Sequence, residues 1–147
     1  MSTKSQDIQT QLRALLKSND LRVTEQRLAV LTTLHLHRTP MTHDEFMRVL
    51  PGGAYDKASV WRVLSDFSGV GLVRRMDLGD RVWRYELHDS CRPVADEHPH
   101  FLCEVCSEVT CLPPLEVRAR DGGFPPALVD AQFQIRISGT CARCVTV

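Results

Sequence analysis

The 147-residue sequence contains no apolar run close to the ~20 residues that a membrane-spanning helix needs. Its first twenty residues are polar and charged and lack the apolar core of a signal peptide, so we expect a cytoplasmic protein. It also lacks a Ser/His/Asp arrangement and a glycine-rich phosphate loop, and its short Gly-rich turns are too brief to cradle a phosphate. We therefore expect a protein that is not an enzyme.

The sequence has no net charge, because 18 Lys+Arg balance 18 Asp+Glu. This neutrality would argue against a nucleic-acid partner, but the charges are unevenly spread. Up to Tyr85 there are 13 Lys+Arg and 9 Asp+Glu, a net charge of +4, and the remainder carries −4 together with all six cysteines. The split predicts a mildly basic module that could meet phosphates and an acidic module that holds the cysteine chemistry.

The first half of the sequence predicts helices followed by a hairpin. The expected helices cover residues 8–17, a segment that begins at Thr24, a segment behind the capping box Thr42-His43-Asp44-Glu45, and a segment capped by Asp56 or Ser59. Two β-prone runs, 72–76 and 81–87, flank the turn residues 77–80. This order predicts a winged helix-turn-helix, whose fourth helix would lie in the major groove of DNA. Its exposed face would carry Lys57, Ser59, Trp61 and Arg62.

The second half predicts a linker and a small domain with short strands. Residues 88–97 are polar and are expected to form the linker. Residues 98–103 and 108–112 are strand candidates, residues 115–120 are a brief helical candidate, and residues 132–138 alternate apolar and polar residues. This alternation predicts a strand that buries Phe133, Ile135 and Ile137 on one face. The resulting fold class is α+β.

Two CxxC pairs carry the strongest chemical pattern, and they are Cys103, Cys106, Cys141 and Cys144. Each pair can direct two thiolates at one ion, and together they make a closed tetrahedral zinc site. The 34 residues between the pairs leave room for a small β domain. A disulfide framework suits an exported chain, and a thioredoxin-like role would leave one pair unused. We therefore predict structural zinc, with redox-active or unligated thiols as the alternatives.

A second group of candidate ligands surrounds the domain junction. His98-Pro99-His100 places two imidazoles on one side of an extended segment, from which both can reach one metal. Glu86 and Cys111 are further candidates, and His88 and Cys91 are weaker ones. A mixture of histidine and thiolate suits Zn²⁺ better than Fe²⁺. The alternative is a set of surface histidines with Cys111 as a small apolar residue of a strand.

Several stretches, in this order, resemble the ferric uptake regulator family over nearly the whole chain. They are residues 21–27, 58–64, 71–73, 85–87, 98–106 and 139–144. The resemblance implies a homodimeric metal-dependent repressor with a winged-helix DNA-binding domain over 1–87, the linker 88–97, and a small α/β dimerisation and metal-binding domain over 98–147.

The resemblance also implies roles for individual residues. Arg27 would approach the DNA backbone or minor groove, and Trp61 and Arg62 would reach thymine methyls and guanine edges. Lys57 would meet a phosphate. The family's inter-domain sensing site would use Glu86, His98 and His100, with Cys111 at the position that often holds a carboxylate.

The sequence departs from the family pattern at several of these positions. Trp61 replaces the usual tyrosine, and Thr39-Pro40 stands where the DNA-binding half would supply a histidine, with His37 and His43 nearby. Pro99 and Phe133 stand where a further site of the family has its acid and its histidine. A thiolate at Cys111 favours zinc sensing.

We therefore expect a zinc-responsive repressor of metal-uptake genes that binds a double-stranded DNA operator. It would hold one structural Zn²⁺ and a second divalent metal, Zn²⁺ rather than Fe²⁺. One alternative is an iron- or peroxide-responsive regulator of the same architecture. Another, from a different class, is a zinc-ribbon adaptor or metal-trafficking protein that does not bind DNA, and a thiol oxidoreductase is the third.

Overall fold

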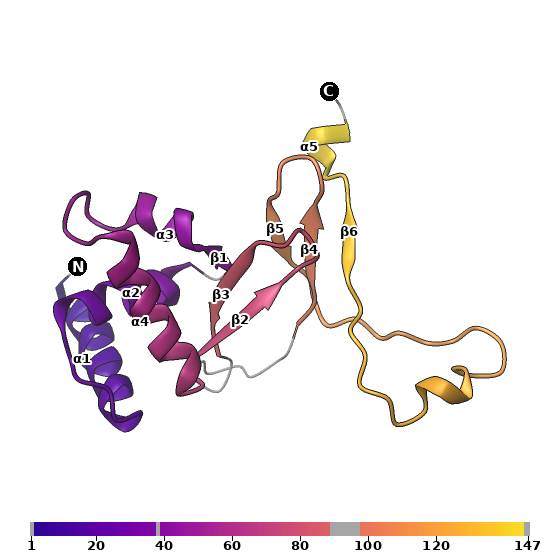
Figure 1. Cartoon of the computed structure of the whole chain (residues 1–147), viewed down its shortest axis with the longest axis horizontal. Helices are drawn as coiled ribbons and strands as arrows, with labels where there is room; N and C mark the ends of the chain where they lie inside the picture. The colour runs from indigo at the N-terminus through magenta and orange to yellow at the C-terminus, as the bar shows by residue number, and fades with distance from the viewer. Residues whose placement is uncertain (1, 38, 89–97, 146–147) are drawn as a thin grey trace. The chain divides into compact units, whose positions relative to one another are not determined.

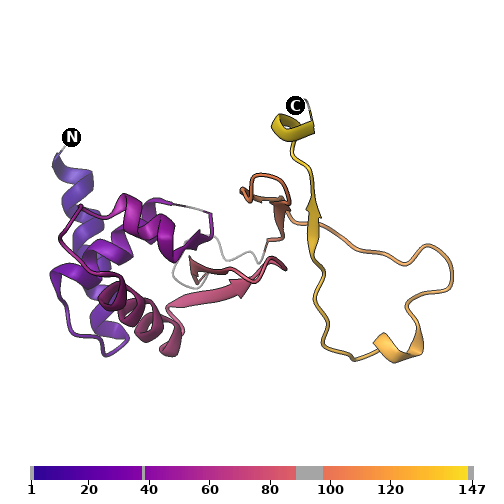
Figure 2. The same cartoon turned by 45° about the horizontal axis from the view of Figure 1, so that its top comes forward.

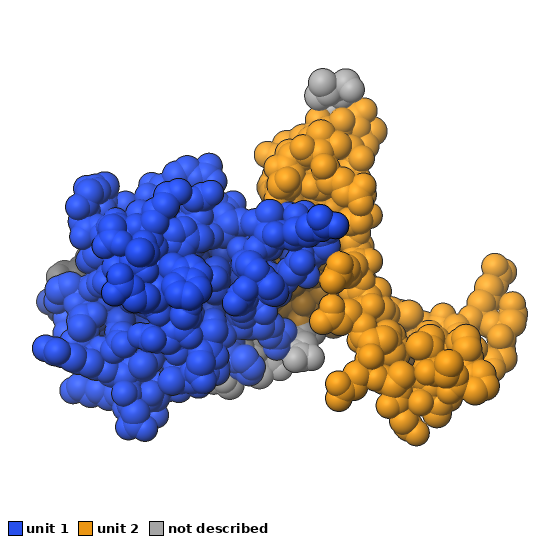
Figure 3. All heavy atoms as spheres, in the orientation of Figure 1, with its two compact units in different colours: residues 1–95 blue, residues 96–147 orange. Residues whose placement is uncertain are grey.

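The computed structural model describes residues 2–37, 39–88 and 98–145 (Figure 1). The chain divides into two compact units, Met1–Ala95 and Asp96–Val147 (Figure 3). The boundary falls within residues 89–97, which lie outside the described residues, as does the candidate ligand Cys91. The predicted limits of the linker therefore stay a prediction. The α+β class is confirmed, because the first unit joins four helices to a small sheet and the second is built on strands.

Three helices of the first unit begin where the sequence predicts, whereas the first begins at Ser2, six residues before the expected start at Ile8. Its elements are α1 (Ser2–Ser18), α2 (Glu25–Leu36), β1 (Met41–Thr42), α3 (His43–Val49), α4 (Lys57–Gly69), β2 (Val73–Asp77) and β3 (Trp83–Leu87). The side chains of Thr24, Thr42 and Asp56 accept the backbone N–H groups that open α2, α3 and α4. At α3 the capping box is complete, because Glu45 returns a hydrogen bond to the amide of Thr42 at 2.6 Å. Each cap satisfies amides that the first turn leaves without an intrahelical partner.

The apolar stripes of the helices meet in one core. Leu16 of α1, Leu31 of α2, Phe46 of α3 and Phe67 of α4 are fully buried in it. In Figures 1 and 2, α1 lies beside α2, and α4 lies between the other helices and the hairpin. This packing fixes the orientation of α4 and leaves its other face to solvent. The described helices are all too short or too polar to span a lipid bilayer.

The small sheet completes a winged helix-turn-helix. Its strand order is β1-β3-β2, with Met41 paired to Tyr85 and Tyr85 to Arg75 in antiparallel register. The hairpin β2–β3 is confirmed as the wing. The two-residue strand β1 is missed by the sequence pattern, because so short a strand has no measurable alternation.

The tip of the hairpin is held by two aspartates. Asp77 Oδ1 accepts the amide N–H groups of Gly79 at 2.7 Å and Arg81 at 3.2 Å. Asp80 accepts the amide of Val82 and forms a two-point ion pair with Arg84, with N···O distances of 2.8 and 2.7 Å. Three backbone donors of the tip are therefore satisfied by its own side chains.

The second unit is a three-stranded sheet with a long crossover. Its elements are β4 (His100–Cys103), β5 (Val109–Cys111), the 3₁₀ helix η2 (Pro126–Leu128), β6 (Ile137–Gly139) and α5 (Ala142–Val145). The strand order is β5-β4-β6, with β5 antiparallel and β6 parallel to β4. Between β5 and β6 the chain leaves the sheet as an open loop and returns, which both views show (Figures 1 and 2).

Two sequence predictions within this loop are wrong. Residues 115–120 are not helical, and of the predicted strand 132–138 only residues 137 and 138 lie in a strand. Phe133 and Ile135 are 50% and 54% exposed, so the predicted buried face does not form within this chain, and only Ile137 joins β6. Prolines at 113 and 114 remove backbone donors, and Gly122 and Gly123 adopt positive φ, which interrupts regular structure on both sides of the predicted helix.

The ion pair at the wing tip gives a test of this fold. The side chain of Arg84 is 3% exposed and that of Asp80 is 23% exposed. The change Asp80→Asn leaves a buried guanidinium without its carboxylate, and we expect it to lower the free energy of unfolding by ~2 kcal/mol at neutral pH. Urea unfolding followed by tryptophan fluorescence measures this, because both tryptophans lie in the first unit.

The same ion pair predicts a pH dependence. The hydrogen bond from Arg84 holds the pKa of Asp80 below its usual value. A carboxylate with a lowered folded pKa stabilises the fold above its unfolded pKa and loses this effect as the pH falls through the folded pKa. The difference between wild type and Asp80→Asn should therefore vanish in acid. Asp44→Asn, which breaks an exposed pair, is the control and should change the stability little at any pH. A difference that does not depend on pH would contradict the assignment.

Candidate metal centres and nucleic-acid interface

Strand pairing brings the two CxxC pairs together. Because β6 runs parallel to β4 with Gly139 opposite Cys103, both strands end at the same edge of the sheet. Cys103 ends β4 and Cys106 lies in the turn to β5, where Ser107 takes positive φ and donates its amide to the Cys103 carbonyl at 2.9 Å. The second pair follows β6 and opens α5. Cysteines at least 35 positions apart in the sequence thus meet at one end of the sheet.

The four sulfurs have the spacing of a tetrahedral metal site. The ligand atoms of Cys103, Cys106, Cys141 and Cys144 lie within 4.8 Å of one another. The Sγ atoms of Cys106 and Cys141 are 3.9 Å apart. A tetrahedral zinc with Zn–S bonds of ~2.3 Å places its sulfurs ~3.8 Å apart. None of the five described cysteines forms a disulfide, so the arrangement fits a metal ion and could hold zinc.

The backbone around Cys103 favours its thiolate form. Its sulfur is fully buried and accepts the amide N–H of Cys141 at 3.4 Å. Amide N–H groups, that of Cys106 foremost and then that of Cys141, lower the pKa of Cys103 to about 6. The hydrogen bond with the Cys141 thiol, followed by desolvation, raises the pKa of Cys144 to about 12. Without a cation the cluster therefore holds a mixture of thiolate and thiol, because like charges at this separation disfavour one another.

Polar contacts tie the two CxxC segments together. Ser138 donates its hydroxyl to Glu104 at 2.6 Å, and the amide of Glu104 donates to the carbonyl of Gly139 at 2.8 Å. Arg143, inside the second pair, forms an ion pair with Glu108. These partners connect β4, the turn and α5 directly, so the positions of the sulfurs are supported from both segments.

A second group of candidate ligands lies at the opposite end of β4. His100 pairs in register with Cys111 of β5, and the amide of Leu112 donates to the Pro99 carbonyl at 2.8 Å. The rings of His98 and His100 have centroids 4.8 Å apart, and their Nε2 atoms are buried. The ligand atoms of His98, His100 and Cys111 lie within 4.8 Å of one another. The second unit by itself thus brings together three of the predicted sensing ligands.

The other candidate ligands belong to the first unit. Glu86 is buried on β3 and pairs in register with Arg74. The backbone amide of His88 donates to the carbonyl of Leu72 at 2.9 Å. The Nε2 atom of His43 hydrogen-bonds to the carbonyl of Lys57 at 2.9 Å, which holds the loop that enters α4.

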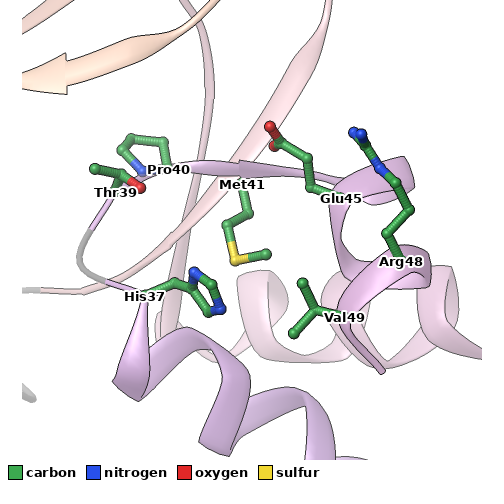
Figure 4. A pocket seen from close by; sticks show the side chains of 7 residues that line it. All are labelled: His37, Thr39, Pro40, Met41, Glu45, Arg48 and Val49. Atoms are coloured by element: carbon green, nitrogen blue, oxygen red, sulfur yellow. The ribbon is translucent and has the colours of Figure 1, made fainter. Parts of the chain in front are cut away.

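His37 lines a pocket of about 280 Å³ within the first unit. Its ring, the thioether of Met41 and the side chain of Val49 face one another, and Thr39 and Pro40 close one side (Figure 4). Glu45 also lines this pocket, but its carboxylate is used by the amide of Thr42. The pocket places His37 beside apolar side chains.

The first turns of α4 carry the predicted DNA contacts. Trp61 and Arg62 are exposed, and Lys57 forms an exposed ion pair with Asp44 at 3.0 Å. Ser59 is half-buried, and its hydroxyl donates to the carbonyl of Asp56 and accepts from Gln26 at 2.6 Å. Ser59 therefore fixes α4 to α2, and the exposed contacts come from its neighbours.

Arg27 is engaged within the protein. Its guanidinium donates to Asp66 of α4 at 2.7 Å and to the carbonyl of Arg22 at 3.0 Å. Sequence reasoning missed the carboxylates of Asp66 and Asp44, because the partners of Arg27 and Lys57 are 39 and 13 positions away along the chain. No local spacing rule connects residues so far apart.

The sequence and the fold were compared with those of known proteins. The profile of the ferric uptake regulator family matches residues 18–121. The ferric uptake regulation protein of Haemophilus ducreyi is 34% identical over 100 residues, which cover 65% of this chain and 64% of that protein. The peroxide operon regulator of Bacillus subtilis is 26% identical over 133 residues, which cover 88% of each chain.

A solved structure agrees with these sequence matches. The ferric uptake regulator from Pseudomonas aeruginosa, determined with manganese, superposes with a TM-score of 0.58 at 27% identity, covering 70% of this chain and 75% of that one. The match to the Haemophilus ducreyi protein spans less than two thirds of that relative's length. The profile, however, covers most of this sequence. The chain belongs to the ferric uptake regulator family.

Proposed function

We propose that this protein is a homodimeric, zinc-responsive repressor that binds duplex DNA through α4. The observation that carries the proposal is the exposed N-terminal half of α4, held beside a hairpin wing in a member of a regulator family. Helices of this kind enter the major groove, and dimers read two half-sites about 34–36 Å or a comparable spacing apart.

The proposed contacts divide by chemistry. Arg62 can donate two hydrogen bonds to a guanine edge, and the ring of Trp61 can pack on a thymine methyl. Lys57 and Arg27 would contact phosphates. To do so, each would either bind the phosphate and its carboxylate partner together or release the carboxylate. Ser59 would act by holding the helix in place.

The donor atoms of the two candidate ligand groups support zinc at two sites. The four cysteines of the closed cluster would hold a structural ion, which would link the end of β4 to α5. His98, His100 and Cys111 would hold a second ion, and a nitrogen and sulfur set favours Zn²⁺ over Fe²⁺. Glu86 is the proposed fourth ligand on the sequence resemblance alone. A ligand from each unit would let the metal select the DNA-competent arrangement, provided that it binds this arrangement more tightly.

A second candidate is an iron- or peroxide-responsive regulator of the same fold. The similarity to the peroxide operon regulator favours it, since that match covers 88% of this chain. This candidate differs from the first in two measurable respects, because Fe²⁺ would then restore DNA binding and Cys111 would be dispensable. A zinc-ribbon adaptor that does not bind DNA remains the alternative from another class.

The first prediction concerns base recognition by α4. We expect Arg62→Ala to lose ~1–3 kcal/mol of binding to a selected operator and little binding to random duplex, because the lost contact reads bases. Lys57→Ala should weaken both by similar factors and reduce the salt slope by about one. Fluorescence anisotropy with labelled duplexes at several salt concentrations measures both effects. Arg13→Ala, an exposed change on α1, is the control. Equal losses on both duplexes for Arg62→Ala would argue against groove reading.

The second prediction concerns metal content. Purified protein should hold two zinc ions per chain, and mild chelation should remove one of them. Cys111→Ala should abolish only the removable ion, whereas Cys106→Ala should abolish the resistant one and destabilise the second unit. Elemental analysis before and after chelation measures this. A single resistant zinc in the wild type would show that the His98–His100–Cys111 group does not bind zinc.

The third prediction concerns switching. Operator affinity should rise by about 5- to 150-fold when zinc is added to chelated protein, which is the usual range of coupling between two sites. His100→Ala should remove this response and keep the weak basal binding. Thr110→Ala is the matched control, since Thr110 is the exposed neighbour of Cys111 on β5. Equal affinities with and without zinc would refute the switch, and restoration by Fe²⁺ alone would favour the second candidate.

A further inference from the structure

Carboxylates engage both of the cations that the proposed function assigns to phosphates. Lys57, the first residue of α4, pairs with Asp44 of α3 at 3.0 Å. Arg27 of α2 pairs with Asp66 of α4 at 2.7 Å. Phosphate contacts position a protein on DNA and carry no sequence information. The pairing within the protein therefore falls on the sequence-independent part of the proposed interface.

The cation assigned to base recognition is not engaged in this way. Arg62 is exposed, and within residues 2–37, 39–88 and 98–145 its side chain has no ion pair or hydrogen bond. Asp66 lies one turn further along α4, but its Oδ2 atom is bound by Arg27. The exposed stretch of α4 thus has a paired cation at each end and an unpaired cation between them.

The ion pair at the start of α4 is held in place by its neighbours. The Nε2 atom of His43 hydrogen-bonds to the carbonyl of Lys57 at 2.9 Å, so the residue before Asp44 is joined to the backbone of Lys57. The hydrogen bond from Lys57, followed by its charge, lowers the pKa of Asp44. Both side chains of the pair are largely exposed, so a phosphate can reach them.

The ion pair near the end of α4 is supported in the same way. The side-chain amide of Gln26 donates to the Ser59 hydroxyl at 2.6 Å, which joins α2 to α4 about two turns before Asp66. The guanidinium of Arg27 also donates to the carbonyl of Arg22 at 3.0 Å. Because the guanidinium is held at two points, the side-chain entropy that weakens most surface ion pairs is already reduced.

A phosphate that binds either paired cation must displace its carboxylate or share the cation with it. The gain is then the difference between two ion pairs, and the carboxylate stays close to the DNA, which repels it. Binding to random duplex depends almost wholly on phosphate contacts. The penalty therefore falls most heavily on random duplex, whereas Arg62 can reach a guanine edge without breaking a contact.

We propose that Asp44 and Asp66 are specificity-determining residues, which compete with DNA phosphates for the cations beside them. By lowering the attraction for DNA of any sequence, they leave the base contacts to decide where the protein binds. The inference rests on the proposed DNA-binding function and adds to it two carboxylates that the base contacts do not use. A purely structural role predicts the opposite sign, because loosening α4 would weaken binding to the operator.

Isosteric amides test the proposal on the full-length, zinc-loaded protein. Asp44→Asn and Asp66→Asn remove the charge and keep the size of the side chain. We expect each to raise the affinity for a labelled random duplex about threefold, on the scale of a surface ion pair, and the double variant to raise it about tenfold. The affinity for a duplex recovered by selection from a random pool should rise less, so that the ratio of the two affinities falls about threefold in the double variant. Fluorescence anisotropy measures both affinities.

Matched variants separate local competition from a change in net charge. Asp7→Asn changes the net charge by the same amount at an exposed position of α1 and should leave both affinities nearly unchanged. Asp66→Glu keeps the charge and should keep the low affinity for random duplex. In a double-mutant cycle, Asp44→Asn should raise affinity less when Lys57 is replaced by alanine, because no cation then remains to be released.

The outcomes separate this inference from the proposed function. Unchanged or lower affinity for random duplex in the amide variants, equal gains on both duplexes, or an equal gain with Asp7→Asn would overturn the role of the two carboxylates and leave DNA binding intact. Absence of binding to every duplex, by wild type and variants alike, would overturn the proposed function as well. Circular dichroism checks that each variant is folded, and Asp44→Asn carries the test by itself if Asp66→Asn is destabilised, because its pair is exposed on both sides.

Discussion

The pairing of β4 with both of its neighbours is the constraint on which both candidate metal sites depend. Its parallel register with β6 places Gly139 opposite Cys103, so the two CxxC pairs meet at one end of the strand. Its antiparallel register with β5 places Cys111 opposite His100 at the other end. Only Phe101 and Leu102 separate the two groups along β4. A one-residue slip in either register would turn the ligands to the opposite face and disperse them.

This arrangement explains which parts of the site the sequence could predict. Local rules identified the caps at Thr24, Thr42 and Asp56 and the convergence expected of each CxxC pair, because these contacts span only a few residues. The parallel pairing of β4 and β6 spans the long crossover, and it leaves no trace in local spacing. The same limit applies to the carboxylate partners of Arg27 and Lys57, which only the folded helices bring near.

Two of the groups that face DNA in the proposed complex are already committed to contacts within the protein. Lys57 is paired with Asp44, and Arg27 is paired with Asp66. The Lys57–Asp44 pair is exposed on both sides, and such pairs contribute little to stability, so a phosphate can compete for Lys57 at small cost. The carboxylates nevertheless reduce the net attraction for DNA. Neutral overall charge and internal pairing together favour weak non-specific binding, so tight binding would depend on geometry that a metal can set.

In the loop between β5 and β6, apolar and polar residues alternate as in a strand, but most of the predicted strand does not form. Phe133 and Ile135 alternate with polar residues as in a strand that is buried on one face, yet both are about half exposed. An amphipathic strand forms only where a second surface covers its apolar side and pairs its backbone. The described part of this chain supplies such a partner only from Ile137 onward, where β6 meets β4. In the proposed homodimer a second copy would provide the missing surface, so the alternation is consistent with a strand that depends on association.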